Sequence, residues 1–305
     1  MSAPDQAPVV PALVAADDLQ VRFGGVTAVA GVSFTLDAGQ CCGLIGANGS
    51  GKSTLLAALS RLCHGQEHGD IRLAGTSAMG WTPARVARWG VARTFQTVRL
   101  VADLDVAENV LVGATPASLA SSADEPDSSA PASRAGTAPS RAGAGAGGGP
   151  GGFWPRRRRR AAEAAARVEE ALDIVGVGEH RRRRPDELPY GLQRRVEIAR
   201  AIVARPRVLL LDEPTAGMTG AERAELGELF RRLAEGGMAV LVVEHDVRFV
   251  TTTCDVAFAL DAGAVIARGT PEQVIASPEV RQAYLGTAAA GPAAPGPAAT
   301  GGSAP

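Results

Sequence analysis

The chain contains few cysteines, few aromatic residues and no long apolar run. These features argue against a disulfide-rich or membrane-spanning protein. Only four of its 305 residues are cysteine, and none belongs to a CxxC pair. Adjacent Cys41 and Cys42 lie in an apolar run, which is typical of small buried hydrophobic residues. We therefore expect a reducing, cytoplasmic setting without a disulfide framework.

The sequence also lacks the features of membrane-spanning and secreted chains. No uninterrupted apolar stretch approaches the ~20 residues that cross a bilayer. The first eleven residues are polar and rich in proline and alanine, so we expect no signal peptide. Any association with a membrane would then depend on partner proteins.

The chain has almost no net charge. It carries 31 basic and 32 acidic residues, so no overall field attracts it to nucleic acid, which we do not expect as a partner. Arginines cluster locally at 156–160 and 181–184. They could approach anionic lipid headgroups, at ~1 kcal/mol per residue, but solvated arginine beside a loop is the simpler interpretation. Binding of single-stranded nucleic acid is a third interpretation, which we do not favour because we expect no aromatic stacking platform at either cluster.

Short apolar segments alternate with helical segments along most of the chain. Helices are predicted at 53–62 and 161–175. Strands are predicted at 13–23, 27–36, 41–45, 70–73, 208–211, 239–243, 256–260 and 264–267, the last two as a hairpin. This alternation predicts an α/β fold with a mostly parallel sheet, and the N-terminal strands predict a small antiparallel sheet beside it.

Three segments differ in composition from the rest. Residues 114–155 and 287–305 consist largely of alanine, glycine, serine and proline, which bury too little apolar surface to offset the entropy of ordering. We predict that both are disordered, as are residues 1–11. One domain is expected over 12–286, with 114–155 as an insertion.

The most specific motif is a glycine-rich loop between an apolar strand and a helical segment. It reads Gly46-Ala47-Asn48-Gly49-Ser50-Gly51-Lys52-Ser53 and satisfies GxxxxGK[ST]. Its glycines let several backbone N–H groups face one point, and the helix N-terminus adds partial positive charge, so phosphate oxygens can bind there. Lys52 would contact the β- and γ-phosphates of a nucleotide, Ser53 would ligate Mg²⁺, and Thr54 completes the expected nucleotide contacts. The loop alone could belong to a kinase, a GTPase, a helicase or a transporter ATPase. A glycine-rich turn that merely begins a helix is the less favoured alternative.

A second motif places two acids at the end of an apolar strand. Asp212 would hold Mg²⁺ directly or through water, and Glu213 would orient or deprotonate the attacking water. A solvated acidic turn is the alternative, and the phosphate loop upstream makes it less attractive. His245 follows the apolar strand 239–243, where it could hydrogen-bond the γ-phosphate or serve a structural role.

In this order the motifs resemble the ATPase family of ABC transporters. The set comprises the phosphate loop, Gln96 in Arg93-Thr94-Phe95-Gln96, the segment Leu188-Pro189-Tyr190-Gly191-Leu192, Asp212-Glu213 and His245. The resemblance covers roughly 13–286 without the insertion. It implies a P-loop ABC ATPase core with a mostly parallel sheet, an N-terminal antiparallel β-subdomain, and an α-helical subdomain over about 98–200.

The resemblance implies roles for further residues. Phe23 would stack on adenine, although a buried strand position is an equal alternative. Gln96 would touch Mg²⁺ or water and report to the membrane subunits, unless it is an ordinary polar loop residue. Pro189, Tyr190 and Gly191 would cap the γ-phosphate of ATP held by the opposite subunit of a head-to-tail dimer, through N–H groups at a helix N-terminus.

This signature departs from LSGGQ, the commonest form in the family. Pro189 replaces the serine and its hydroxyl contact, although proline is compatible with the first helical turn. Leu192 stands where glutamine is usual, while Gly191 still allows close backbone approach. The segment Ala216-Gly217-Met218-Thr219 replaces the usual SALD dimer contact. These departures leave open a weaker phosphate contact, two unequal sites, or a cassette that binds ATP as a structural clamp.

A finer resemblance is to branched-chain amino-acid importer ATPases of the LivG type. It is carried by residues 21–25, 93–100, 190–200, 244–246, 269–272 and 283–286. It implies a second ATPase subunit, homologous or identical, two integral-membrane permeases, an extracytoplasmic solute-binding protein, and a peripheral position on the cytoplasmic face of the membrane. Importers of urea or short amides, and a soluble ABC ATPase outside transport, are the alternatives.

Overall fold

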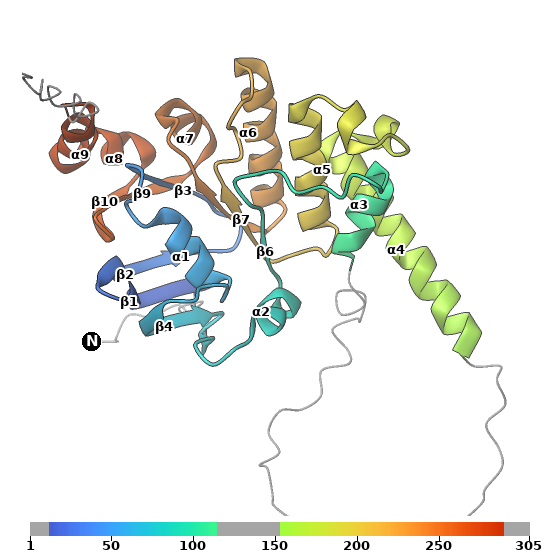
Figure 1. The fold of residues 1–305 in the computed structure, drawn as a ribbon, viewed down its shortest axis with the longest axis horizontal. Helices are drawn as coiled ribbons and strands as arrows, with labels where there is room; N and C mark the ends of the chain where they lie inside the picture. Colours follow the sequence, from blue (N-terminus) through green and yellow to red (C-terminus); the bar gives the residue numbers. More distant parts are fainter. Residues whose placement is uncertain (1–11, 115–152, 290–305) are drawn as a thin grey trace, which may run out of the picture. The chain divides into compact units, whose positions relative to one another are not determined.

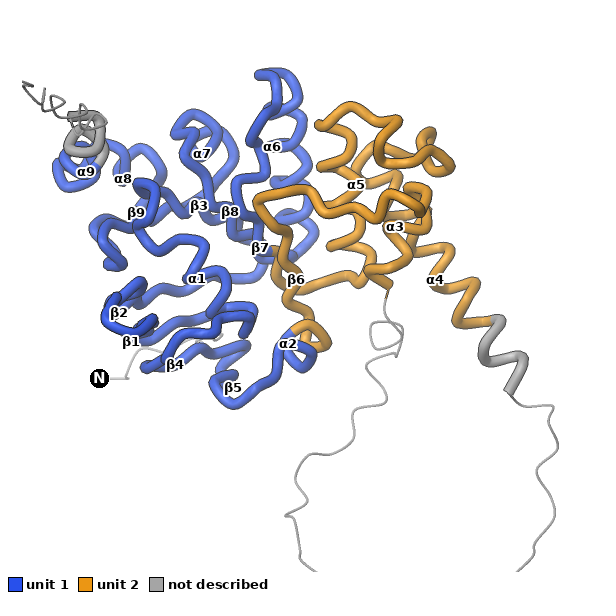
Figure 2. The backbone as a smooth tube through the Cα atoms, in the orientation of Figure 1, with its two compact units in different colours: residues 1–86, 210–305 blue, residues 87–209 orange. Residues whose placement is uncertain are grey.

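The computed structural model describes residues 12–114 and 153–289, which fall into two compact units. Unit 1 comprises residues 1–86 and 210–305, and unit 2 comprises 87–209, each within the described ranges (Figure 2). The disorder predicted for 1–11, and for most of the insertion and the tail, lies outside the described residues. At the edges of these segments, residues 153–155 and 287–289 belong to helices.

Unit 1 begins with an antiparallel sheet in the order β2-β1-β4-β5 (Figure 1). Its first strand pairs with both β2 and β4 in antiparallel register. The turn between β1 and β2 uses Gly24, whose φ of 56° favours glycine. The strands are β1 Val14–Phe23, β2 Val26–Leu36, β4 Gln66–Leu73 and β5 Thr76–Ser77. The predicted N-terminal antiparallel sheet is confirmed.

The larger sheet has the order β10-β9-β3-β8-β7. Strand β3 runs parallel to β8 and β9, and β9 forms an antiparallel hairpin with β10. Every residue of β3, β7 and β8 is buried, as expected for parallel strands covered on both faces. The strands are β3 Cys41–Gly46, β7 Val208–Asp212, β8 Ala239–Val243, β9 Val256–Asp261 and β10 Ala264–Gly269, and the short strand β6 Val91–Arg93 belongs to unit 2.

Aromatic contacts lock the layers of unit 1 together. Phe34 of β2 stacks on Phe258 of β9 with ring centroids 4.9 Å apart, which joins the two sheets. Phe230 and Phe249 meet edge to face at 6.2 Å, which joins α6 to α7. The helices of unit 1 are α1 Lys52–Leu59, α6 Gly220–Glu235, α7 Val247–Thr253, α8 Pro271–Ala276 and α9 Pro278–Ala289. The four cysteines are free, and Cys63 is the one that is not fully buried.

Unit 2 is mostly helical and includes the range 98–200 predicted for the helical subdomain. Helices α3, α4 and α5 pack on one another. Asp105 caps α3 in a reciprocal pair with Glu108, and the fully buried Asn109 bonds both main-chain groups of Val101. The elements are α2 Pro83–Trp89, which starts in unit 1, α3 Val106–Gly113, α4 Phe153–Val175, α5 Tyr190–Ile202, and the 3₁₀ turns η1 Gly178–His180 and η2 Pro185–Glu187.

Candidate active site

The glycine-rich loop of unit 1 connects β3 to α1 as a tight backbone cradle. Gly51 has a φ of 103°, and a Cβ there would lie 2.2 Å from the carbonyl oxygen of Ala28. A Cβ at Gly46 would lie 2.3 Å from the carbonyl oxygen of Leu260, so neither position accepts a side chain. The first turn of α1 contains no acidic residue, and its N–H groups and partial positive charge suit an anion. This geometry is that of a phosphate-binding loop.

Lys52 holds its ammonium group over this loop. Nζ donates hydrogen bonds to the carbonyl oxygens of Gly46 and Ala47, each at 2.8 Å. Burial lowers the pKa of Lys52, while the negative charges of Glu213 and Asp212 act in the opposite direction. The lysine charge therefore lies within electrostatic reach of both predicted acids.

Ser53 and Asp212 bring two oxygen ligands side by side. The Ser53 hydroxyl oxygen lies 3.3 Å from Oδ1 of Asp212, although 159 positions separate the two residues. Asp212 ends β7 and is almost fully buried. Hydroxyl and carboxylate oxygens are the hard ligands that Mg²⁺ prefers, so these residues fit the metal that the resemblance implies.

Glu213 begins the loop after β7 in a rare backbone conformation. Its φ is 46°, in the left-handed region that residues other than glycine seldom occupy. Its N–H donates to the carbonyl oxygen of Val243 at 3.0 Å, which joins the carboxyl ends of β7 and β8. Such strained conformations cluster at active sites.

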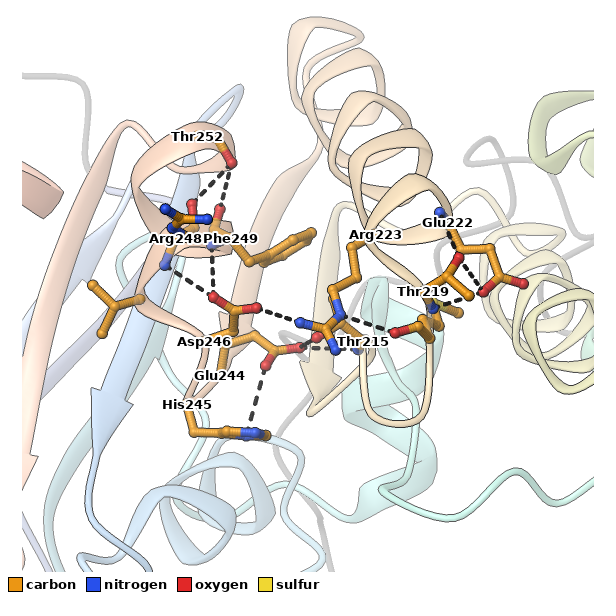
Figure 3. Close-up of polar contacts among 12 residues, drawn as sticks. Thr215, Thr219, Glu222, Arg223, Glu244, His245, Asp246, Arg248, Phe249 and Thr252 are labelled. Carbon is orange, nitrogen blue, oxygen red and sulfur yellow. Dashed lines mark hydrogen bonds and ion pairs between the residues drawn. The ribbon is translucent and has the colours of Figure 1, made fainter. Parts of the chain in front are cut away.

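The carboxyl end of β8 continues into Glu244 and His245 (Figure 3). Glu244 is fully buried, and its Oε1 accepts hydrogen bonds from the N–H and the hydroxyl of Thr215, at 2.9 and 2.7 Å. Burial raises the pKa of Glu244, and the Thr215 hydrogen bonds and His245 offset only part of this rise. The His245 side chain is 61% exposed, so it is not a buried structural histidine.

Arg223 of α6 links Asp246 to the loop after β7 (Figure 3). Its Nη1 donates to Oδ2 of Asp246 at 2.7 Å, and its Nε donates to the carbonyl oxygen of Met218 at 3.1 Å. Burial alone would raise the pKa of Asp246, but hydrogen bonds from the Phe249 N–H, Arg223 and the Arg248 N–H hold it below its usual value. A pocket of about 510 Å³ is lined by Thr215, Ala216, Gly217, Arg223, His245 and Asp246.

In unit 2, a buried ion pair holds the segment that leads to Gln96. Arg194 is fully buried, and its Nη1 donates to Oε2 of Glu197 at 2.5 Å and to the carbonyl oxygen of Phe95 at 2.6 Å. The second oxygen of Glu197 accepts from the Phe95 N–H at 3.5 Å. One ion pair on α5 therefore binds both main-chain polar groups of the residue before Gln96, which itself is exposed.

The predicted signature segment begins helix α5. Pro189 is the N-cap residue of this helix, so it stands just before the first turn rather than within it, and it makes no side-chain cap. The N–H groups of Leu192 and Gln193 bond back to the Pro189 carbonyl oxygen, and the helix is not broken. Tyr190 is 41% exposed and Gly191 is buried.

Unit 1 thus gathers the phosphate loop, the two acids and His245 at the carboxyl edge of its larger sheet. Phe23 ends β1 and is 44% exposed, which is incompatible with the buried alternative. Gln96 and the signature segment belong to unit 2.

Sequence reasoning missed Glu244, Thr215 and Arg223. Glu244 carried a signal, because a charged residue directly follows the fully apolar strand β8. The partners Thr215 and Arg223 carried none, since their side-chain contacts with 244–246 depend on how the loop after β7 packs.

A phosphate loop between β3 and α1, with paired acids after β7, defines a P-loop nucleotide-binding ATPase domain. Comparison with known proteins specifies the family. The model of the ABC transporter family matches residues 29–216, and that of the branched-chain amino acid ATP-binding cassette transporters matches 264–290. The chain belongs to the ABC transporter family.

Relatives of known sequence support the same assignment. The high-affinity branched-chain amino acid transport ATP-binding protein LivG of Salmonella typhimurium is 36% identical over 277 residues, 90% of this chain and 98% of LivG. The corresponding protein BraF of Pseudomonas aeruginosa is 36% identical over 272 residues, 88% of this chain and 96% of BraF. The predicted ABC ATPase subunit is confirmed.

A solved structure supports the fold. A nucleotide-free ATP-binding cassette from an ABC transporter superposes with a TM-score of 0.70 at 23% identity, over 89% of this chain and 98% of that one. The predicted fold class is therefore confirmed. None of the described helices combines the length and hydrophobicity needed to span a bilayer.

Proposed function

We propose that this chain binds ATP with Mg²⁺ at the phosphate loop and hydrolyses it to power import of branched-chain amino acids. The observation that carries the site is the convergence of Lys52, Ser53, Asp212 and Glu213, with the Ser53 hydroxyl 3.3 Å from Asp212. The names of LivG and BraF, and the match of residues 264–290, support the solute class.

Each binding residue has its own part in this proposal. Lys52 and the N–H groups of the loop from Gly46 to Thr54 hold the phosphates, and Phe23 stacks on the adenine. Ser53 and Asp212, together with Gln96, hold Mg²⁺, which when bound neutralises charge on the phosphate oxygens.

Glu213 acts on the attacking water. The water oxygen forms a bond to the γ-phosphorus, the bond from that phosphorus to the bridging oxygen breaks, and ADP leaves. Glu213 accepts the proton that the water loses. His245 donates a hydrogen bond to an oxygen of the γ-phosphate.

A second ATPase subunit, homologous or identical, completes each site. Its α5 N-terminus, at Pro189, Tyr190 and Gly191, offers backbone N–H groups to the γ-phosphate. Since proline brings no hydroxyl, this contact depends on the backbone alone.

Exposed apolar side chains in unit 2 suit a contact with membrane permeases. Phe95, Val101, Leu111 and Val112 are between 43% and 54% exposed, and exposed apolar residues mark interaction surfaces where they group together. Two permeases would hold the chain on the cytoplasmic face of the membrane, with a solute-binding protein on the other side.

Glu213→Gln tests the site. The amide keeps the size of the side chain but cannot accept the water proton, so ATP turnover should fall by about 100-fold or more while ATP affinity changes little. Turnover by the purified chain and binding of a fluorescent ATP analogue measure the two effects. Glu228→Gln is the matched control, because Glu228 is exposed on α6 and paired only with Arg231 among the contacts of the described residues.

Two results would overturn parts of this proposal. Turnover at the wild-type rate in Glu213→Gln would remove Glu213 as the group that acts on water. Retained ATP binding in Lys52→Ala would remove the phosphate loop as the nucleotide site. For the solute, uptake of labelled leucine by a deletion strain complemented with this chain should be competed by isoleucine and valine, and competition by urea or short amides instead would replace the solute class.

A further inference from the structure

Glu244 is a buried acid that the proposed reaction leaves without a task. Its side chain is 0% exposed, and its N–H donates to the carbonyl oxygen of Leu44 at 3.1 Å. The main chain is therefore anchored to β3, directly beside the phosphate loop. A carboxyl group in such a position is costly unless its oxygens find partners.

One carboxyl oxygen is fully satisfied by a single residue. Oε1 accepts from the N–H of Thr215 at 2.9 Å and from its hydroxyl at 2.7 Å (Figure 3). Thr215 lies two positions after Glu213 and is itself buried. Glu244 therefore fixes the start of the loop that carries the proposed water-activating residue.

The other carboxyl oxygen faces His245. Oε2 is buried and has no hydrogen-bond partner among the described residues, and it lies 3.9 Å from Nδ1 of His245 (Figure 3). This separation exceeds a hydrogen bond. The imidazole is 61% exposed, however, so most of the ring is not held in place by packing against other residues. Hydrogen bonds at active sites are often longer before the reacting complex forms.

The neighbourhood of Oε2 favours a neutral acid that donates. Burial raises the pKa of Glu244, and the carboxylate of nearby Asp246 is paired with Arg223 at 2.7 Å. A protonated carboxyl has one O–H donor, and Oε1 already accepts twice from Thr215. In the protonated form of Glu244 the O–H therefore lies on Oε2, which faces Nδ1 of His245 at 3.9 Å.

We propose that Glu244 is a positioning residue that donates a hydrogen bond from Oε2 to Nδ1 of His245 while its Oε1 holds Thr215. The bond to Nδ1 places the imidazole proton on Nε2, on the far side of the ring, where it can be donated to an anionic oxygen. Glu244 thereby couples the orientation of His245 to the position of the loop after Glu213. The role of the Nε2 proton rests on the proposed function, but the Glu244–His245 bond does not.

Imidazole ¹⁵N spectroscopy of the full chain tests this bond directly. The chain has four histidines, and His245→Gln identifies the signals of His245. In the wild type, Nδ1 and Nε2 of His245 should differ in chemical shift from those of His64 and His68, which are exposed. Glu244→Met, which cannot donate, should move the His245 signals to the values of the exposed pair. Unchanged His245 signals in Glu244→Met would overturn the proposal.

Two further variants keep the test decisive. Glu244→Gln can accept from Thr215 and donate to Nδ1, so it should keep the wild-type His245 signals. Thr215→Val removes only the hydroxyl donor to Oε1 and should shift those signals partway, even if Glu244→Met does not fold. Unmoved His245 signals in Thr215→Val would overturn the coupling, and Glu228→Gln should leave them unmoved as the control.

ATP turnover separates this proposal from the proposed function. Glu244→Met should lower kcat about tenfold or more with ATP affinity preserved, and Glu244→Gln should recover most of it. Shifted His245 signals with unchanged kcat would support the Glu244–His245 bond and would count against the role of His245 in hydrolysis.

Discussion

Two buried carboxyl groups are satisfied in different ways in the two units. In unit 2, Glu197 faces Arg194 at 2.5 Å, and together they bind the N–H and the carbonyl of Phe95. In unit 1, Glu244 receives uncharged donors from Thr215 and keeps one oxygen toward His245. Both acids connect a predicted catalytic segment to a neighbouring element.

The difference suggests different mechanical roles. A buried charge that loses its partner carries a large free-energy cost. The Arg194–Glu197 ion pair therefore suits a contact that stays unchanged through the reaction. A buried acid with uncharged donors can change its protonation state and its partner at lower cost. Glu244 therefore suits a contact that changes during the reaction, and it lies beside the loop that reaches the proposed reaction centre.

Breaking the Arg194–Glu197 ion pair should have the largest effect on the free energy of unfolding. Arg194→Met leaves Glu197 buried without its guanidinium, and we expect the free energy of unfolding to fall by about 3–5 kcal/mol. Urea unfolding followed by circular dichroism measures this loss. Because the Phe95 carbonyl also loses its donor, the Gln96 segment should loosen, and amide hydrogen exchange at 95–97 should accelerate.

The double variant Arg194→Met/Glu197→Leu is the control for this effect. It removes both charges together, so it should be less destabilised than Arg194→Met alone. A double variant as unstable as the sum of the single variants would show that the pair is not coupled, and the comparison with Glu244 would fail.

The sequence predicted the chemical groups of the site more fully than the buried contacts that hold them in place. Ser53 and Asp212 lie 159 positions apart, yet each follows a buried apolar strand. The carboxyl ends of parallel strands share one edge of a sheet, so their meeting was predictable. Helix α4 beginning at Phe153 was not, because the glycine-rich composition around the boundary favours disorder.

The contacts of Arg194 and Glu244 were not predictable in this way. Arg194 reaches Phe95 across 99 positions, and Glu244 reaches Thr215 across 29. Phe95 lies in the Gln96 motif and Thr215 follows the paired acids, but neither motif specifies these contacts, which depend on which side chain a packed helix or loop turns inward. A single sequence contains the charge but does not specify its partner.

A change of pH should alter the contribution of Glu244 to stability, with an effect of intermediate size. Since burial raises the pKa of Glu244 above its usual 4.5, the folded state binds this proton more tightly than the unfolded state. The stability that this carboxyl contributes is full below the unfolded pKa and is lost as pH rises through the folded pKa. Each pKa unit between the folded and unfolded states is worth about 1.4 kcal/mol of stability.

Glu244→Gln isolates this contribution, because the amide does not titrate. Urea unfolding of both chains at a series of pH values that begins below the unfolded pKa of 4.5 should show the wild type losing stability relative to the variant as pH rises. Parallel curves at every pH would mean that Glu244 does not hold its proton more tightly in the folded state. Glu228→Gln serves as the exposed comparison.

Loss of an exposed ion pair should have the smallest effect on the free energy of unfolding. It gives the reference value against which the effects at Arg194 and Glu244 are compared. Arg205 and Glu170 of unit 2 meet at 2.5 Å, as close as Arg194 and Glu197, but their side chains are 63% and 50% exposed. Water solvates each charge when the partner is lost, so Arg205→Ala should lower the free energy of unfolding by less than about 1 kcal/mol. Urea unfolding in low and in high salt measures this small loss, and salt should remove it. A loss as large as that of Arg194→Met would mean that distance, rather than burial, governs these pairs.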